Sequence, residues 1–152
     1  MIVYRIGRTK YGRDLTGEGA RLNGGRWNHK LTPCIYTSES RSLAVLEYTV
    51  NINIDDIPRA LSITTLEVSD KKILELSIVQ LPRNWREAPA PASAKDLVTP
   101  LLKELKYPVL KIPSAVIPNE YNYLLNPLHS DRSKFLIVDV QDFVYDVRIK
   151  NI

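Results

Sequence analysis

The sequence contains few of the side chains on which many enzyme classes depend. Its 152 residues include one cysteine, Cys34, and two histidines, His29 and His129. A single cysteine excludes an intramolecular disulfide, and the three residues do not have the spacing of a zinc site. Neither histidine stands in the motif of a Ser-His-Asp triad. We therefore expect no bound metal, and we look for the function in other side chains.

Long hydrophobic runs are also missing. No window contains the ~20 apolar residues that a membrane-spanning helix needs. The first residues, MIVYRIGRTK, lack the apolar stretch of a signal peptide. Hydrophobic residues make up 44% of the chain and charged residues 25%, which is the ordinary balance of a folded soluble protein. We expect a cytoplasmic protein without a membrane partner, folded as one domain over residues 1–152.

The net charge of +4 is modest and does not gather in one run. Nucleic-acid-binding domains usually carry a clustered basic stripe with interleaved aromatic residues, so we expect no direct nucleic-acid partner. Basic residues do outnumber acidic ones near the N-terminus: Arg5, Arg8, Lys10, Arg13, Arg21, Arg26 and Lys30. A small anionic ligand such as a dinucleotide, a nucleic acid, or an ordinary solvated face would each account for this local bias.

Glycine is scarce, yet four of the six glycines lie between Gly17 and Gly25. Glycine is most useful where the backbone needs a positive φ or must approach a ligand closely. The same segment, GEGARLNGGRWN, carries Arg21 and Arg26, and a planar guanidinium suits phosphate and carboxylate groups. The segment is either an anion cradle or a hairpin loop with solvated arginines, and the glycine pattern alone does not decide between them.

A strand and a helix are predicted after this segment. Residues 34–37 form a short β-prone run after Pro33. Ser38 is then predicted to cap a helix over residues 39–50 through its side-chain oxygen. Each element is short, so the chain should turn sharply between them.

Glu47 stands out in the predicted helix. At about 100° per residue it shares a face with apolar residues. These are Leu43, Leu46 and Val50. A carboxylate in an apolar stripe is costly unless it is paired, hydrogen-bonded or facing a cleft. Glu47 is therefore our candidate functional carboxylate. The alternative is a surface contact within the helix, or a frayed last turn that lets the side chain swing into water.

The rest of the chain alternates irregularly between strands and helices. Strands are predicted at residues 2–6, 60–68, 72–76, 107–112 and 135–140, with a helix at 93–106 and a helical turn from 118. Residues 7–21 are predicted as a long polar loop, and loops of that length are often functional. Without a regular βαβ rhythm, this order favours an α+β fold with a mixed or antiparallel sheet over a doubly wound parallel one.

Several residues in the second half have alternative interpretations. The helix at 93–106 has Ser93 as its candidate cap and a kink at Pro100, or it starts at Pro100 with Thr99 as its cap. Ser114, at a strand end, either caps a turn or contacts a ligand. Trp85 is predicted to be a packing anchor within an irregular, proline-rich surface connector. Other polar residues that share a face are Asn122 and Asn126.

Four segments along the chain together resemble one known family. They are GEGARLNGGRWN, IYTSES, SLAVLE and PSAVIPNEYNYLLNPLH, in that order. They resemble the RES domain, the toxin half of a bacterial toxin–antitoxin system, named for an Arg, a Glu and a Ser. The resemblance covers nearly the whole chain. It implies a core similar to the ADP-ribosyltransferase toxins, in which a split pair of small sheets holds NAD+ in the cleft between them.

The resemblance also implies roles for individual residues. Glu47, in AVLE, matches the family glutamate, the candidate catalytic carboxylate. Arg26, in GGRW, matches the family arginine, expected to contact phosphate or ribose. Tyr36, in IYTS, matches an aromatic expected to pack on the nicotinamide side. The remaining expected NAD+-binding residues are Arg5, Ser114 and Asn122.

By this resemblance the protein is a toxin that degrades NAD+ as its substrate, by hydrolysis or phosphorolysis of the nicotinamide–ribose bond. The transition state of such a cleavage resembles an oxocarbenium ion, and it requires no metal. The alternatives are a toxin that transfers ADP-ribose to a protein, and a basic domain that binds a nucleotide or nucleic acid without turnover. An RNA-cleaving toxin is disfavoured because neither histidine has a partner for general acid–base chemistry. The implied partner is an Xre-type helix-turn-helix antitoxin, and a homodimer is compatible with the sequence.

Overall fold

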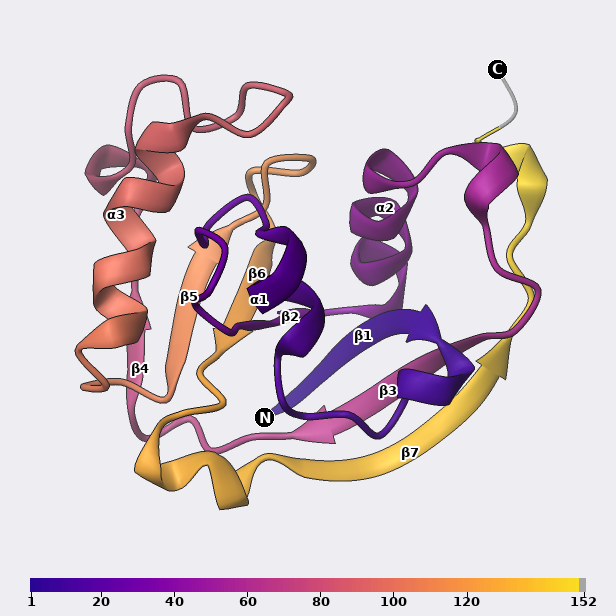
Figure 1. Ribbon diagram of the computed structural model, residues 1–152, viewed down its shortest axis with the longest axis horizontal. Helices are drawn as coiled ribbons and strands as arrows, with labels where there is room; N and C mark the ends of the chain where they lie inside the picture. Colours follow the sequence, from indigo (N-terminus) through magenta and orange to yellow (C-terminus); the bar gives the residue numbers. More distant parts are fainter. Residues whose placement is uncertain (151–152) are drawn as a thin grey trace.

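The computed structural model describes residues 1–150, and a seven-stranded sheet forms its frame (Figure 1). The strand order is β4-β5-β6-β2-β1-β3-β7. The strands are β1 (Ile2–Arg8), β2 (Ile35–Ser38), β3 (Leu61–Glu67), β4 (Ile73–Glu75), β5 (Val109–Pro113), β6 (Tyr121–Leu125) and β7 (Leu136–Phe143). Only β4 and β5 pair in parallel; the other neighbours are antiparallel. The predicted α+β class with a mixed sheet is confirmed.

The helices lie at different parts of this frame. Figure 1 shows α3 beside β4 and β5, and α2 near β1 on the other side of the molecule. The α-helices are α1 (Glu18–Asn23), α2 (Arg41–Asn51) and α3 (Ala92–Lys103), and the 3-10 turns are η1 (Thr9–Tyr11), η2 (Ile54–Asp56), η3 (Ile78–Gln80), η4 (Ser130–Lys134) and η5 (Val147–Ile149). No helix within residues 1–150 is long and apolar enough to cross a membrane.

The sheet consists of two halves joined at a narrow point. β1 pairs with β3 along its whole length, from Ile2 to Arg8, but its register with β2 contains a single pair, Tyr4 with Ser38. Around this junction the strands β4, β5 and β6 run in a different direction from β1, β3 and β7 (Figure 1). The two halves of one hydrogen-bonded sheet thus correspond to the split pair of sheets that the resemblance implies.

Two tryptophans anchor the chain segments on the α3 side of the sheet. Trp27 and Trp85 are almost fully buried, and their rings stack with centroids 6.1 Å apart. They belong to an apolar cluster that includes Val98 and Leu102 of α3 and Leu110 of β5. Aromatic pairs of this kind add stabilisation beyond their buried area. The prediction that Trp85 is a packing anchor is confirmed.

The cap predicted for α2 is wrong by two residues. Ser40, rather than Ser38, accepts a hydrogen bond from the backbone N–H of Leu43 at 3.1 Å. Ser38 remains in β2 because it pairs with Asn122 across the β2–β6 ladder. Two serines near a helix start have the same local capping ability, and the partner strand decides which one remains extended.

The turn predicted from residue 118 is present, closed by a 2.9 Å hydrogen bond from the Glu120 backbone N–H to the Ile117 carbonyl, but it does not continue as a helix, because residues 121–125 form β6. Strands β2 and β5 pair with β6 on both sides and satisfy its backbone groups. Within the strand, the buried Asn122 and Leu124 alternate with the partly exposed Tyr121 and Tyr123. This alternation is the period of a half-buried strand, and it outweighs the Pro-Asn-Glu sequence that suggested a helical start.

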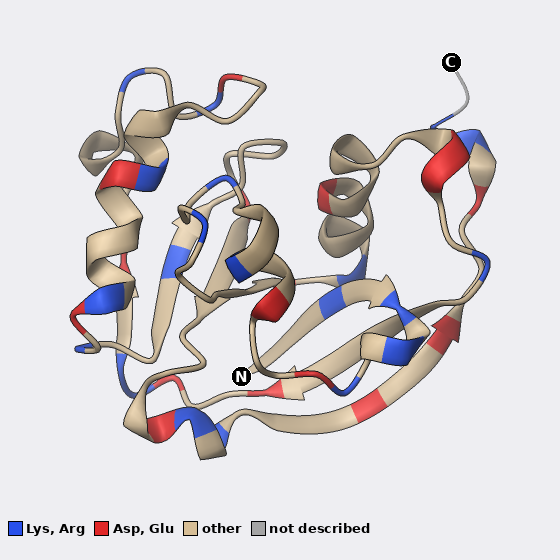
Figure 2. Cartoon of the chain, viewed as in Figure 1, with Lys and Arg blue, Asp and Glu red and all other residues tan. Residues whose placement is uncertain are grey.

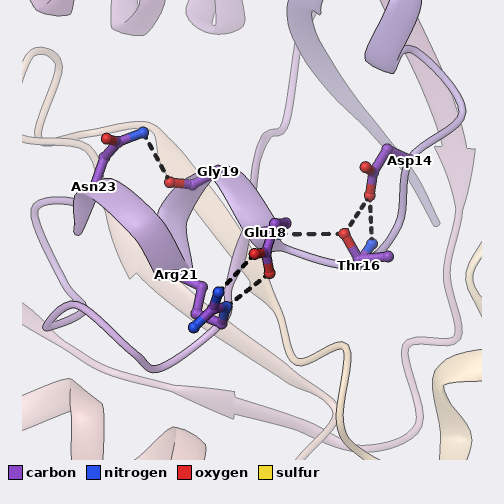
Figure 3. A network of polar contacts seen from close by, with 6 residues as sticks. All are labelled: Asp14, Thr16, Glu18, Gly19, Arg21 and Asn23. Carbon is purple, nitrogen blue, oxygen red and sulfur yellow. Dashed lines mark hydrogen bonds and ion pairs between the residues drawn. The ribbon is translucent and has the colours of Figure 1, made fainter.

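The region predicted as a polar loop from residue 7 to 21 contains the turn η1 and the start of α1. Local contacts hold α1 in place, as Figure 3 shows. Thr16 Oγ1 accepts from the Glu18 backbone N–H at 3.3 Å, and the Arg21 guanidinium forms two 2.7 Å hydrogen bonds with the Glu18 carboxylate. Gly17 precedes the helix with a φ of +69°. Arg21 is thus engaged within its own helix rather than in an anion cradle.

Helix α3 begins at Ala92, one residue before the predicted cap. Ser93 lies inside the first turn, where its hydroxyl donates to Asn84 Oδ1 at 2.7 Å. Pro100 lies within the helix, so the alternative start at Thr99 is wrong. The helix tolerates the proline because its buried residues, Val98 and Leu102, continue to pack in the core on both sides of it.

Replacing Trp85 with alanine should destabilise the fold strongly. A buried tryptophan truncated to alanine costs about 3–5 kcal/mol of unfolding free energy, through lost burial and the cavity left behind. Val79→Ala is the matched control, because Val79 is 91% exposed in the neighbouring turn η3. Denaturant unfolding of both variants measures the difference, and a loss below about 1 kcal/mol for Trp85→Ala would contradict its anchoring role.

Candidate active site

Glu47 lies in the second half of α2, and its carboxylate is held by one oxygen. The Ser114 hydroxyl donates to Glu47 Oε1 at 2.6 Å, and the Asn122 amide Nδ2 donates to the same oxygen at 2.7 Å. Such hydrogen bonds to a carboxylate are among the strongest in proteins. Within residues 1–150, Oε2 receives no hydrogen bond. The carboxylate is therefore anchored through one oxygen, and the other is available to a ligand.

The apolar face of α2 differs from the predicted one. Its buried residues are Leu43, Ala44, Val45 and Thr49, whereas Val50 is 55% exposed. The C-terminal segment explains the difference, since the hydroxyls of Thr49 and Tyr145 lie 2.6 Å apart and that segment covers this side of the helix. Glu47 is partly buried at the border of the apolar face. Its contacts with two other elements exclude the alternative of a frayed or purely intrahelical side chain.

Ser114 follows β5 and is fully buried. Its Oγ accepts hydrogen bonds from the backbone N–H groups of Val116 and Ile117, both at 3.0 Å. With its oxygen occupied by two donors, the hydroxyl has its proton directed at Glu47. Ser114 thus caps the turn after β5, which confirms that interpretation, and it also orients the Glu47 carboxylate, whereas a contact with a ligand stays a prediction.

Asn122 connects Glu47 to the junction of the two half-sheets. Its Oδ1 accepts a hydrogen bond from the Ser38 hydroxyl at 2.6 Å, while its Nδ2 donates to Glu47. Ser38 and Asn122 are directly opposite in the β2–β6 ladder, and both are buried. Sequence reasoning missed this role of Ser38, and only the β2–β6 register could have revealed it. A polar chain therefore runs from Ser38 through Asn122 and Glu47 to Ser114.

Arg26 lies on the loop after α1, close to Glu47 but not paired with it. Its Nη1 donates to the backbone carbonyls of Trp85 and Glu87, both at 2.9 Å. Partial burial lowers the pKa of Arg26 below its ordinary value, and the nearby Glu47 and Tyr36 act in the opposite direction. Within residues 1–150, Nε and Nη2 of Arg26 donate no hydrogen bond. The two carbonyls thus position the Arg26 guanidinium, and its other nitrogens remain available to an anion.

Tyr36 supports the same loop from β2. Its hydroxyl donates to Asn28 Oδ1 at 2.6 Å and accepts from the Trp27 backbone N–H at 3.0 Å. Burial raises the pKa of Tyr36 well above its ordinary value, so it stays a neutral phenol. A Cβ on Gly25 would stand 2.5 Å from the Tyr36 hydroxyl oxygen, so the close approach requires glycine. Tyr36 therefore fixes the backbone from which Arg26 projects.

Asn28 is a structural residue that sequence reasoning did not single out. It is completely buried, and its Nδ2 lies within hydrogen-bond distance of the carbonyls of Ala20, His29 and Thr32. Together with the Tyr36 contact, these bonds close the loop that follows α1. A lone asparagine beside a Gly-Gly-Arg sequence is the only sequence signal, and it does not identify the partners.

Arg5 lies apart from this hydrogen-bonded chain. Its guanidinium donates to the backbone carbonyls of Tyr11, Gly12 and Asp14 at 3.3, 3.1 and 2.7 Å. Burial lowers the pKa of Arg5, which the charge of Asp14 partly opposes. Val3, which shares a face of β1 with Arg5, is fully buried, whereas Ile2 on the other face is 41% exposed. The structure thus shows Arg5 organising the loop after β1, and a contact with NAD+ stays a prediction.

The connector at residues 85–87 bridges two sides of the candidate site. Its carbonyls hold Arg26, and Arg86 Nε donates to the Ala115 carbonyl at 3.0 Å, next to Ser114. The connector therefore joins the loop that carries Arg26 to the turn that carries Ser114. Sequence reasoning treated this segment as a surface connector and missed its contribution to the site.

Two hollows on the surface of the described residues lie away from Glu47. One of about 90 Å³ is lined by Ser69, Lys71, Lys72, Pro108, Val109, Asp131, Lys134 and Phe135, and one of about 490 Å³ by His29, Asp96, Thr99, Pro100, Lys103 and Glu104. Neither includes the residues around Glu47, so we place the candidate site by its hydrogen bonds. No group of three potential metal-ligating side chains occurs within residues 1–150. Lysine and arginine residues are distributed over several separate elements in this range (Figure 2).

Known proteins similar to this chain cover almost all of it. A protein named Toxin Res from Yersinia enterocolitica is 38% identical over 152 residues, covering 99% of this chain and 100% of the relative. Another Toxin Res, from Photorhabdus laumondii, is 35% identical, with coverage of 98% and 97%. A protein named Prs ADP-ribosylating toxin, from Sphingobium sp., is 31% identical over 145 residues, with coverage of 93% and 90%.

The fold is also found in a solved structure. A chain of the crystal structure of the M. tuberculosis MbcT–MbcA toxin–antitoxin complex matches with a TM-score of 0.76 and 21% identity, covering 94% of this chain and 84% of that one. A likeness at this identity shows that the two chains share a fold, and it agrees with the predicted α+β class. The family model described as the RES domain matches residues 2–146. The chain therefore belongs to the RES domain family.

Proposed function

We propose that this RES domain is the toxin of a bacterial toxin–antitoxin system and that it degrades NAD+ by cleaving the nicotinamide–ribose bond. The toxin assignment is supported by the relatives named Toxin Res. NAD+ as the substrate is supported by the relative named as an ADP-ribosylating toxin, since NAD+ is the usual donor of ADP-ribose. The site chemistry provides a separate argument.

The proposal rests on the way in which the Glu47 carboxylate is held by its hydrogen bonds. Its Oε1 is fixed by Ser114 and Asn122, and Oε2 is free of hydrogen bonds from residues 1–150. Cleavage of a glycosidic bond develops positive charge on the ribose, and a preorganised carboxylate stabilises that charge without reorienting. A carboxylate held on one side only suits this task, because the free oxygen can meet the ribose.

The neighbouring residues then have distinct tasks. Arg26 contacts a phosphate or the ribose through Nε and Nη2, and it thereby fixes the position of the ribose relative to Glu47. The ring of Tyr36 lies on the nicotinamide side, and its hydroxyl holds the Arg26 loop. Ser114 and Asn122 act through the carboxylate that they position. Arg5 is a further contact with the dinucleotide.

The acceptor of ADP-ribose defines the reaction class. Transfer to water makes the protein a glycohydrolase, and transfer to inorganic phosphate makes it a phosphorylase. A protein side chain as acceptor is the second candidate, and the name of the Sphingobium relative favours it. The site residues described above serve all three acceptors, because bond cleavage at the ribose is common to them.

An antitoxin partner follows from the proposed toxicity. An enzyme that depletes NAD+ must be restrained in the cell that makes it. We therefore propose that the protein acts in the cytoplasm, where it meets its antitoxin. The solved toxin–antitoxin complex with the same fold supports such a partner. We propose an Xre-type helix-turn-helix antitoxin that covers the site around Glu47. A homodimer of the toxin is a further proposal, tested by its mass in solution at micromolar concentration.

Glu47→Gln should lower the rate of NAD+ consumption by at least about a hundredfold, because it removes the charge that stabilises the transition state. Glutamine has a similar volume, so no cavity forms. Glu67→Gln is the matched control on an exposed position of β3. Nicotinamide release by purified, folded variants measures the effect. Full activity of Glu47→Gln would remove the carboxylate from the proposed mechanism.

Arg26→Lys should weaken NAD+ binding by roughly ten- to a hundredfold. The planar guanidinium of arginine can bond to the two carbonyls and to an anion at the same time, and the ammonium group of lysine cannot. Calorimetry in the Glu47→Gln background measures affinity without turnover. Arg21→Lys is the matched control, because Arg21 lies in the same glycine-rich segment but pairs with Glu18. Equal affinities for the protein with and without Arg26→Lys would exclude Arg26 from the phosphate site.

A further inference from the structure

We propose that Ser38 is a positioning residue of this site: its hydroxyl donates to the Asn122 amide oxygen and so stabilises the amide orientation in which the N–H group donates to Glu47. The proposal concerns a residue that does not contact Glu47 itself. Its activity readout rests on the proposed function, whereas its structural readout does not.

The contacts form a continuous buried path. Ser38 is 4% exposed and Asn122 is 8% exposed. The Ser38 hydroxyl donates to Asn122 Oδ1 at 2.6 Å, and Asn122 Nδ2 donates to Glu47 Oε1 at 2.7 Å. Both bonds are short, and the ladder between β2 and β6 holds the two backbones opposite each other. The amide thus has a donor on its oxygen and an acceptor on its nitrogen.

The orientation of this amide matters because its two ends are nearly equal in shape and opposite in hydrogen-bonding character. A half-turn about the last side-chain bond of Asn122 would place its oxygen against the Glu47 carboxylate, where two acceptors would repel each other. The Glu47 carboxylate, which only accepts, selects the present orientation, and the Ser38 hydroxyl stabilises that orientation by donating to the buried amide oxygen. Without that hydroxyl the oxygen is buried and unsatisfied, which disfavours the active orientation.

The neighbouring residue provides a contrast within the same strand. The hydroxyl of Thr37 is also buried, and it donates to the backbone carbonyl of Tyr123 at 2.7 Å. Thr37 therefore supports the sheet itself, whereas Ser38 bonds to the side chain that holds the carboxylate. A general effect of losing a buried hydroxyl from β2 would appear in both positions, and a positioning effect would appear only at Ser38.

Ser38→Ala should lower kcat for NAD+ roughly tenfold, as expected when a residue that orients a functional side chain is lost. KM should stay within about twofold, because Ser38 has no contact with the substrate side of Glu47. Thr37→Val, which keeps the shape and removes the hydroxyl, is the matched control and should leave both constants unchanged. An unchanged kcat in Ser38→Ala, or an equal loss in Thr37→Val, would overturn the proposal.

A double-mutant cycle tests whether Ser38 acts through Asn122. Asn122→Ala removes the amide, so Ser38→Ala added to it should cause no further loss of kcat. If the two losses multiply instead, Ser38 acts by another route and the proposal is wrong. Thermal unfolding of each variant separates this coupling from a shared loss of stability.

The structural readout follows the amide directly by nuclear magnetic resonance. Hydrogen exchange of the Asn122 side-chain amide, assigned by its absence in Asn122→Ala, should be at least about tenfold faster in Ser38→Ala than in the wild type. Thr37→Val should leave it unchanged. Unaltered exchange in Ser38→Ala would refute the proposal even if the protein consumed no NAD+, and absent NAD+ consumption with faster exchange would refute only the proposed function.

Discussion

One oxygen atom, Oε1 of Glu47, ties three distant parts of the chain together. It joins α2 to the turn after β5 through Ser114 and to β6 through Asn122. Withdrawing a carboxylate from water is expensive unless charge-assisted hydrogen bonds replace its hydration. Here two donors do so on one oxygen, and the partly exposed position leaves the other oxygen its access to ligand. Support for the fold and preparation of the site are therefore the same interaction.

A second constraint holds the arginine. The stacked Trp27 and Trp85 bring the loop after α1 against the connector before α3, and the connector carbonyls then receive Arg26. Tyr36 can close this loop only because Gly25 has no side chain. Aromatic packing, a missing Cβ and two backbone carbonyls thus set where one guanidinium stands. The cation and the carboxylate are close enough to influence each other without forming a pair.

Local sequence patterns predict those elements that can be recognised without knowing which distant residues they contact. Strands β1, β3 and β5 follow from their apolar and β-branched residues, and the position of Glu47 follows from the helical period, although Val50 on the predicted stripe is exposed. The sequence alone does not distinguish Ser38 from Ser40 as the cap of α2, because either serine can cap a helix. The pairing of β2 with β6 settles that choice, and no local pattern contains it.

The site depends even more on distant partners. Ser114 and Asn122 lie 67 and 75 positions from Glu47, and the connector carbonyls lie 59 and 61 positions from Arg26. Composition and spacing cannot predict such contacts, and the motif resemblance names candidate site residues without predicting what they touch. Asn28 and Ser38 were missed for the same reason, since their roles exist only once the sheet is assembled.

The most direct test of the central claim is to analyse the products formed from NAD+ by the purified protein, free of any antitoxin, with and without inorganic phosphate. Our account predicts one free nicotinamide for each NAD+ lost, accompanied by ADP-ribose, its phosphorylated form or ADP-ribosylated protein. Intact NAD+ after prolonged incubation with demonstrably folded protein would contradict it, and the arrangement around Glu47 would then have to serve binding without cleavage.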